Sequence, residues 1–238
     1  MLIDFLGTGA AWPIPRLGCD CAQCTSSDPR DERLRSSLLV DRRVLVDAGP
    51  DAYRQLRRAG VVPEAVVVTH SHHDHTLGLH ELAKLRLPLY LTKASEREIR
   101  KLFPRLDYRI MHIAPGIPVD LGEGLELRAF DVEHGSTPTL GLRLQRDGRS
   151  VAYMPDLGAP PASKLARNAD LAVVDGSSRS RPVGGHLPME QMIAVAAKLR
   201  PGRTLFTHIG HRTGTQVELE EWLPEGFGVA YDGLQVDV

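Results

Sequence analysis

Hydrophobic residues follow two patterns that alternate along the chain. Short runs of β-branched and aliphatic residues, bounded by turn residues, predict strands. They lie at residues 2–6, 37–40, 44–46, 65–68, 125–132, 140–144, 150–154, 171–174 and 204–206. Longer segments with apolar residues three and four positions apart predict helices. These lie at residues 51–59, 76–85, 94–102, 161–167, 189–199 and 217–222.

The order of these elements narrows the fold class. The first strands follow one another closely, and strands and helices then alternate. This order suits two mixed sheets packed face to face with helices outside, and it equally suits a three-layer doubly wound sheet. A chain of 238 residues is long enough for one large core and short for two ordinary domains with a linker. We therefore expect a single domain over residues 1–238.

Composition and charge disfavour several classes of protein. The chain has 42% hydrophobic and 25% charged residues, the balance of a globular protein. Its formal net charge of −1 gives no general attraction to nucleic acid or anionic lipid. The first residues, MLIDFL, lack the features of an export signal, and no apolar run has membrane-spanning length. We expect a cytoplasmic protein without a membrane or nucleic-acid partner.

The segment THSHHDH, which directly follows an apolar run, carries most of the chemical information. His70, His72, His73 and His75 surround Asp74 here. So many imidazoles would repel one another if protonated, and as neutral groups they are the commonest metal donors. In an extended loop His70 and His72 project to the same side, while Asp74 and His75 can turn towards a second ion. The spacing therefore indicates a site for two metal ions.

Further ligands are expected where later strands end. His134, Asp156 and His208 each follow an apolar run. Taken singly, each is the ordinary turn or capping residue that such positions favour. Two ions need donors beyond one short segment, so the three together are candidate ligands.

The order of these residues resembles the signature of the metallo-β-lactamase superfamily, His-x-His-x-Asp-His followed by a His, an Asp and a final His. The resemblance covers nearly the whole chain and implies an α/β fold, an αββα sandwich of two mixed sheets flanked by helices. It implies one ion on His70, His72 and His134, another on Asp74, His75 and His208, and Asp156 between them. Asp47, in the sequence VDAG, matches a recurring element that orients a ligand imidazole.

All the cysteines lie in CDCAQC, as Cys19, Cys21 and Cys24. They are too crowded for a disulfide framework, and three thiolates need one further donor for a tetrahedral zinc. The best distant donor is His211. With the complete ligand set, this cluster resembles the cyclic phosphodiesterases of bacterial phosphonate degradation, which carry a structural zinc on such cysteines and a late histidine.

A proton donor for the leaving group is expected in the loop GGHLP. The position of His186 corresponds to a catalytic histidine in the phosphodiesterase and transfer-RNA-processing branches of the superfamily. We expect His186 to act as general acid or phosphate-binding donor, with Asp175 orienting it and Asp74 as the further catalytic residue. Arg179, Arg181 and Arg212 lie in loops near these residues and are candidates for binding phosphate oxygens.

The resemblance implies a metal-dependent phosphodiesterase that opens small cyclic phosphodiesters, phosphoribosyl 1,2-cyclic phosphate or 2′,3′-cyclic nucleotides, with a metal-activated hydroxide. The expected cofactors are two catalytic divalent ions, manganese or zinc, and one structural zinc. The expected partner is a small anionic substrate, and the apolar stretch 85–91 is a candidate homodimer interface. Two alternatives stay open, a transfer-RNA 3′-end endonuclease and a noncatalytic metal-binding or carrier protein of the same fold.

Overall fold

Two seven-stranded sheets form the centre of the computed structural model, which describes residues 1–238. The first sheet has the order β14-β1-β2-β3-β4-β5-β6, and the second has the order β13-β12-β11-β10-β9-β8-β7. The strands of the first are β1 Leu2–Gly7, β2 Ser37–Val40, β3 Val44–Val46, β4 Ala65–Val67, β5 Pro88–Leu91, β6 Arg109–His112 and β14 Gln235–Asp237. The strands of the second are β7 Pro118–Asp120, β8 Glu126–Val132, β9 Thr139–Arg146, β10 Arg149–Met154, β11 Leu171–Asp175, β12 Arg203–Thr207 and β13 Phe227–Val229.

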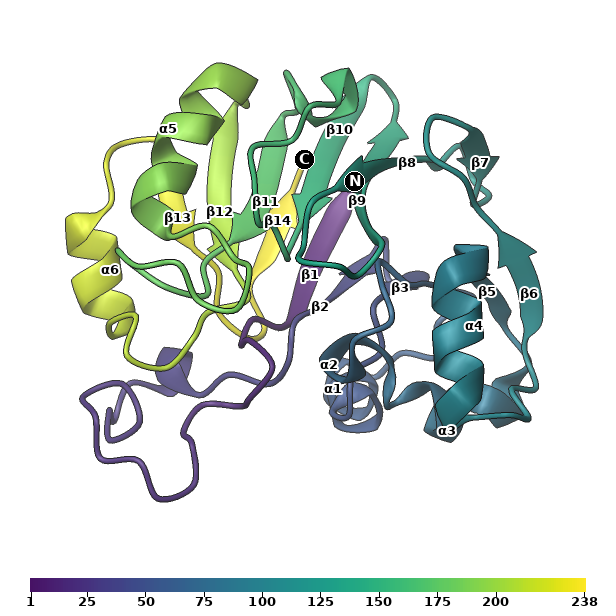
Figure 1. Cartoon of the computed structure of the whole chain (residues 1–238), viewed down its shortest axis with the longest axis horizontal. Helices are drawn as coiled ribbons and strands as arrows, with labels where there is room; N and C mark the ends of the chain where they lie inside the picture. Colours follow the sequence, from purple (N-terminus) through teal and green to yellow (C-terminus); the bar gives the residue numbers. More distant parts are fainter.

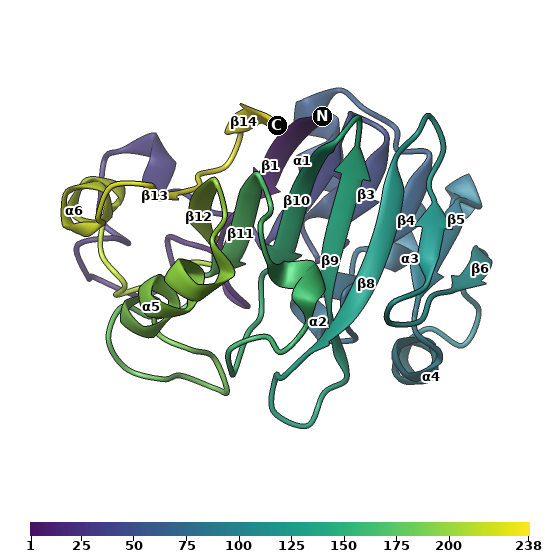
Figure 2. The same ribbon diagram turned by 90° about the horizontal axis from the view of Figure 1, so that it is seen from above.

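Helices cover the outer faces of both sheets (Figures 1 and 2). On the first sheet they are α1 Ala52–Ala59, α2 His73–Thr76, α3 Leu79–Leu82 and α4 Lys93–Leu102. On the second they are α5 Met189–Leu199 and α6 Gln216–Trp222. Short 3-10 turns lie at Pro29–Asp31, Ala83–Leu85 and Lys164–Ala166.

The largest buried cluster lies between the two sheets. It includes Ile3 and Phe5 of β1 and, from the facing sheet, Leu127, Leu142 and Tyr153. Because alternate residues of each strand point inward, both sheets have one face in this core and the other under helices. This arrangement confirms the predicted αββα sandwich and excludes the three-layer doubly wound sheet.

All the expected strands are present, but two expected helices differ from the structure. Residues 161–167 contain only the turn Lys164–Ala166, and residues 76–85 are divided into short pieces around Gly78. The Ser163 side chain accepts the Leu165 N–H, so the turn begins only at Lys164, and Asn168, with a φ of 51°, breaks the helical conformation after it. Strands β5, β6, β7, β13 and β14 were not expected, because short strands in a large sheet lack a clear period.

The apolar stretch 85–91 is exposed only in its first part, where Leu85 is 44% exposed. Its second half forms β5, in which Leu89 and Leu91 are fully buried. β5 pairs with β4 on one side and β6 on the other. Residues 88–91 are apolar because they form an interior strand, and the homodimer interface stays a prediction.

Strand direction places the chemistry of the chain at one edge of the sandwich. β10, β11 and β12 are parallel, and β8 points the same way because β9 is antiparallel to both β8 and β10. Residues that follow these strands therefore meet at one edge. The two termini lie side by side at the opposite end of β1, where β14 pairs with it (Figure 1). None of the helices has the length and apolarity needed to cross a membrane.

Candidate metal centre

The histidine-rich segment changes from strand to helix at this edge. β4 ends at Val67, and α2 begins at His73, with His72 in an extended conformation before it. The run of valines favours a buried strand, and the polar residues after it have no place in the core. The turn therefore carries the imidazoles out of the sheet and towards the second sheet.

Three imidazoles and one carboxylate meet in a first cluster. His70 Nε2 lies 2.9 Å from His72 Nδ1, and His134 Nε2 lies 3.2 Å from the same atom. Asp156 completes the group, and the donor atoms of all four residues lie within 4.8 Å of one another. His134 comes from the segment after β8 and Asp156 from the segment after β10. The structure thus brings together the residues expected to hold the first ion.

A second cluster consists of Asp74, His75 and His208. Asp74 Oδ2 lies 3.3 Å from His75 Nε2 and 3.4 Å from His208 Nε2. Asp156 stands between the clusters: its Oδ2 is 3.2 Å from His75 Nε2, and its Oδ1 is 3.7 Å from His134 Nε2. Asp156 thus lies between the two clusters, where the resemblance implies a bridging carboxylate.

The donor set fits divalent metal ions. A tetrahedral ion with Zn–N bonds of about 2.0–2.1 Å holds its nitrogen ligands roughly 3.3 Å apart, close to the separations in the first cluster. His75 Nε2 and Asp156 Oδ2 are buried and have no hydrogen-bond partner. Buried polar atoms without partners are costly, and a cation between them removes that cost.

Charge in the site favours metal binding as well. Burial lowers the pKa of His70 far below its ordinary value, and burial also lowers the pKa values of His72 and His134. These rings are therefore neutral and keep a lone pair for a ligand. Burial opposes ionisation of Asp156, but the surrounding histidines, His208 first, hold its pKa below the ordinary range. In the first cluster, neutral nitrogen donors therefore lie beside an ionised carboxylate, the combination that divalent cations require. In the second cluster, burial is outweighed by Asp156 and the neighbouring carboxylates, which raise the pKa of His75 well above its ordinary value and that of His208 to about 9, so these rings would release protons on binding an ion.

Residues behind the two clusters fix the orientation of the imidazoles. Asp47 is fully buried, and its Oδ2 lies 2.8 Å from His75 Nδ1. Asp47 Oδ1 accepts the backbone N–H of Thr69 at 2.8 Å, and the Thr69 hydroxyl lies 2.9 Å from His70 Nδ1. One carboxylate thus positions a ring in each cluster, the role predicted for Asp47.

Backbone strain accompanies this arrangement. Asp47 and His208 have φ angles of 61° and 55°, in the left-handed region that residues with a side chain rarely adopt. Such conformations persist only where the surroundings determine them, and they gather at functional sites.

Two hydroxyl partners were not predicted from the sequence. Thr69 joins Asp47 to His70, and Thr137 Oγ1 lies 2.9 Å from His72 Nε2. In the sequence, only Thr69 could have been noticed, because it directly precedes the expected ligand His70. Thr137 lies in the loop after β8 and contacts a residue 65 positions away, a contact that no local sequence pattern predicts.

The proposed acid has the partner that the sequence indicates. His186 Nδ1 donates to Asp175 Oδ2 over 2.5 Å. Asp175 is itself fixed, because its carboxylate accepts the backbone N–H groups of Leu157 and Ser177. With Nδ1 occupied, Nε2 is the free ring nitrogen of His186, whose ring packs against those of His134 and His208.

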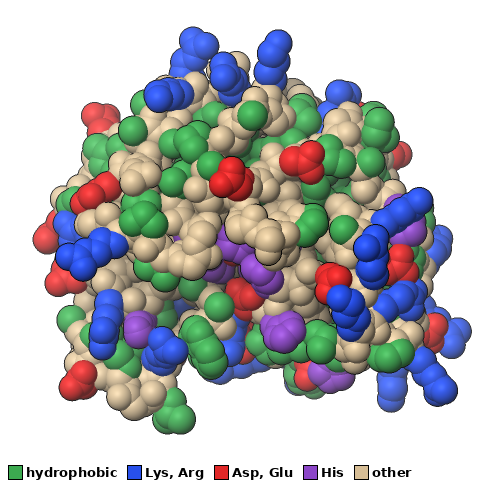
Figure 3. Space-filling model, in the orientation of Figure 1, with side chains coloured by type: hydrophobic (Ala, Val, Ile, Leu, Met, Phe, Trp, Pro, Cys, Tyr) green, Lys and Arg blue, Asp and Glu red, His purple; other side chains and the backbone are tan.

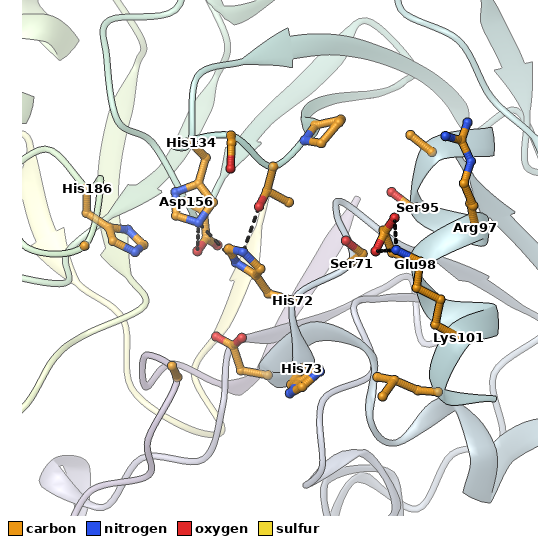
Figure 4. A pocket seen from close by; sticks show the side chains of 18 of the residues that line it. Ser71, His72, His73, Ser95, Arg97, Glu98, Lys101, His134, Asp156 and His186 are labelled. Atoms are coloured by element: carbon orange, nitrogen blue, oxygen red, sulfur yellow. Dashed lines mark hydrogen bonds and ion pairs between the residues drawn. The ribbon is translucent and has the colours of Figure 1, made fainter.

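A cavity of about 860 Å³ gives access to the two clusters (Figure 4). His72, His134, His186 and Asp156 lie together on one side of this view, and Ser95, Arg97, Glu98 and Lys101 of α4 line the other. His73 also lines the cavity but is exposed and is not part of either cluster. In Figure 3, histidine side chains are visible in a hollow near the centre of the face.

The cysteines form a separate group. The sulfur atoms of Cys19, Cys21 and Cys24 lie within 4.8 Å of one another, as a shared ion requires. The structure does not bring His211 into this group. His211 lines a cavity beside Arg16, and the Arg16 backbone N–H lies 3.3 Å from Cys24 Sγ. The predicted fourth donor is therefore a neighbour of the cluster without being part of it.

Comparisons with known proteins agree with this geometry. The chain is 26% identical to an octanoyltransferase of Porphyromonas gingivalis over 97% of its length, but it spans only 50% of that protein. It is 28% identical to the coenzyme PQQ synthesis protein B of Cupriavidus necator, with 98% of each chain covered. A crystal structure of a diphosphatase from the PhnP family superposes with a TM-score of 0.87 and 32% identity, covering 100% of this chain and 97% of the other.

A family model also matches most of the chain. Residues 42–209 match the beta-lactamase superfamily domain. The match includes Asp47, the histidine-rich segment, His134, Asp156 and His208, the residues that form the two clusters and their support. The chain therefore belongs to the beta-lactamase superfamily and resembles the diphosphatases of the PhnP family.

Proposed function

We propose that residues 1–238 form one hydrolase domain, a metal-dependent phosphodiesterase acting on small cyclic phosphodiesters. The observation that carries the proposal is the buried His186–Asp175 pair beside two clusters of metal donors. A superfamily site that only binds metal has no need for a sixth, separately oriented imidazole beside the five of the two clusters. An acid placed there suits a reaction in which an alkoxide leaves and must be protonated.

Each residue has a definite part in this reaction. His70, His72 and His134 would hold one ion, Asp74, His75 and His208 the other, and Asp156 would be shared. When bound, such ions activate water and polarise a phosphoryl oxygen. His186 Nε2 delivers the proton to the leaving oxygen, and Asp175 keeps the Nδ1 proton in place. Zinc and manganese both suit a set of nitrogen and oxygen donors.

The test is steady-state hydrolysis by protein of known metal content, before and after exchange with manganese. The substrates are a 2′,3′-cyclic nucleotide, phosphoribosyl 1,2-cyclic phosphate, a noncyclic aryl phosphodiester and precursor transfer RNA. Preferred opening of a cyclic phosphate supports the proposal. Cleavage of the RNA alone identifies a nuclease, and no cleavage of any of the four by protein with both ions bound removes the support for the proposed substrate.

A further inference from the structure

A threonine hydroxyl lies against the outer nitrogen of one imidazole in the first cluster. Thr137 Oγ1 is 2.9 Å from His72 Nε2. On the other side of the same ring, His72 Nδ1 faces His70 Nε2 at 2.9 Å and His134 Nε2 at 3.2 Å. The two ring nitrogens of His72 therefore have different surroundings, one among metal donors and the other beside a hydroxyl group.

This difference decides which nitrogen of the ring carries the proton. A neutral imidazole has one N–H and one lone pair, on different nitrogens. Nitrogens that converge on a cation must each present a lone pair to it. His72 Nδ1 belongs to such a group, whose donor atoms lie within 4.8 Å of one another. The proton is therefore on Nε2, and this N–H donates to Thr137 Oγ1.

His72 depends on this hydrogen bond more than its two neighbours depend on theirs. His70 is fully buried and His134 is 4% exposed, so packing holds both rings. His70 also has a partner of its own, the Thr69 hydroxyl at 2.9 Å. His72 is only half-buried and lines the cavity shown in Figure 4, so packing holds only part of its ring. The contact with Thr137 fixes the remaining side.

The backbone around Thr137 holds the hydroxyl in place. The Thr137 N–H donates to the His134 carbonyl at 3.2 Å, and the Thr137 carbonyl accepts the Thr139 hydroxyl at 2.9 Å. At the start of β9, the Leu140 N–H donates to the Thr69 carbonyl at 3.1 Å, which attaches this loop to the histidine-rich segment. These bonds use only the backbone of Thr137, so a change of its side chain leaves them intact.

We infer that Thr137 is a positioning residue of the metal centre, which fixes the ring and the tautomer of His72 so that Nδ1 faces the first ion. The inference rests on the part of the proposed function that assigns an ion to His70, His72 and His134, and it is independent of the substrate. The loop between β8 and β9 then has two roles, because it supplies one ligand and orients another. The chemical requirement at residue 137 is a hydroxyl group, since the hydrogen bond to His72 is made by that group alone.

The experiment removes the hydroxyl group and keeps the shape of the side chain. Thr137→Val cannot accept the His72 N–H, whereas Thr137→Ser keeps the acceptor. The matched control is Ser136→Ala, which removes a neighbouring hydroxyl from the same cavity wall. Zinc affinity is measured by competition with a chromophoric chelator. We expect a loss of about 10–100-fold for one ion in Thr137→Val, and affinities within about 3-fold of the wild type in Thr137→Ser and Ser136→Ala.

A second measurement follows the proton itself. NMR spectra of the histidine rings in isotope-labelled, zinc-loaded protein distinguish an Nδ1–H from an Nε2–H tautomer and report how fast the proton exchanges with water. We expect His72 to be the Nε2–H tautomer, with a slowly exchanging proton in the wild type and Thr137→Ser. In Thr137→Val the same proton should exchange rapidly, because its acceptor is gone. A role of Thr137 in loop stability alone would not change this exchange selectively.

Four outcomes would overturn the inference: wild-type zinc affinity in Thr137→Val, an equal loss in Thr137→Ser, a loss as large in Ser136→Ala, or an Nδ1–H tautomer of His72. If the wild type binds zinc and cleaves none of the substrates proposed above, only the substrate assignment fails, and these measurements still decide the role of Thr137. If the wild type binds no ion at the clusters, the proposed function and the inference both fail.

Discussion

His186 is the residue on which the assignment of a hydrolytic reaction depends most. Its ring is largely buried, bonded through Nδ1 to Asp175, and stacked on His208 with ring centroids 5.2 Å apart. Donor atoms of His186, Asp156 and His208 lie within 4.8 Å of one another, so these residues form a further group able to hold a metal ion. Removing a metal ligand lowers the metal content of the protein, whereas removing a proton donor lowers turnover and leaves the metal content unchanged.

Replacing His186 by Ala is therefore expected to lower kcat by roughly 10²–10⁴-fold with both ions retained. Turnover on a cyclic phosphate and metal content by mass spectrometry are measured on the same preparation. Asp175→Asn should lower turnover in the same direction, because the amide no longer holds the Nδ1 proton. Loss of an ion from His186→Ala would make His186 a ligand, and unchanged turnover would remove it from the mechanism.

Asp47 supports both clusters from behind and touches neither cavity. Asp47→Ala leaves His75 Nδ1 and the Thr69 N–H and hydroxyl without their acceptor. We expect metal affinity to fall about 10–100-fold, measured by competition with a chromophoric chelator. Asp107→Ala is the control, since the Asp107 side chain is 66% exposed and pairs only with Arg86. Equal affinities for wild type and Asp47→Ala would contradict the supporting role.

At the scale of elements, close approach of two turns holds the second cluster. The backbone of Gly49, between β3 and α1, lies against the carbonyl of Asp74, and a Cβ at Gly49 would be 2.0 Å from that oxygen. Gly78, where the helix expected at residues 76–85 is interrupted, packs in turn on the Gly49 carbonyl. Its N–H donates to Ala48 at 2.9 Å. The interruption of the helix thus coincides with the closest contact between the two turns.

Gly78→Ala is accordingly expected to separate these turns, because its Cβ would lie 2.2 Å from a backbone oxygen. We expect destabilisation of about 1–3 kcal/mol by urea unfolding, with weakened binding of the second ion. Gly228→Ala in β13 is the control, as its Cβ would meet only the movable side-chain ends of Leu205 and Arg203. Equal unfolding free energies for Gly78→Ala and Gly228→Ala would show that the contact between the two turns does not stabilise the protein.

The cysteine loop is a second element with its own prediction. Hydrogen bonds from Arg30 to Glu220 and from the Gln216 N–H to Asp31 tie the end of this long segment to α6, whereas the tip carries the cysteines. Changing Cys19, Cys21 and Cys24 together to Ser should remove one zinc and leave the other two ions, by elemental analysis. His211→Ala tests the fourth donor: loss of the same zinc would assign it, and retention would exclude it. Three ions in the triple variant would contradict a zinc on the cysteines.

For the molecule as a whole, a buried polar network joins segments from both ends of the chain. Arg33 is 1% exposed and donates to the Thr8 hydroxyl, which in turn donates to Asp232. Burial raises the pKa of Asp232 to about 6. Hydrogen bonds from the Leu34 N–H and the Thr8 hydroxyl lower this pKa, but by less than burial raises it. A carboxyl with a raised pKa in the folded state binds a proton more tightly there than in the unfolded chain.

This sign makes the contribution of Asp232 to stability decline as pH rises from about 4 to about 6. The difference in unfolding free energy between wild type and Asp232→Asn should therefore fall across this range, by as much as about 3 kcal/mol. Urea unfolding of both proteins at several pH values measures it. Because every other titrating group is shared, the difference isolates Asp232. A difference independent of pH would place the Asp232 pKa at its ordinary value.

Much of this protein was determined by local sequence. Apolar runs of sheet type located nine strands because burial on both faces requires continuous Val, Leu and Ile. The dense histidine segment indicated metal binding because no other common role places so many imidazoles together. The partners His134, Asp156 and His208 could be named because each follows an apolar run and together they match the order of the family signature.

Tertiary structure alone decided the rest. The sequence of β5 does not show that it is an interior strand, because that depends on its pairing with β4 and β6. Thr137 approaches His72 only because a distant loop folds against it. A cavity of about 980 Å³ beside His186 is likewise lined by Arg16, Arg181 and Arg212, which come from three separate loops. Sequence reports which donors and charges a chain possesses, because side-chain chemistry is local. Which of them face one another depends on how distant loops pack, and that is determined by the fold.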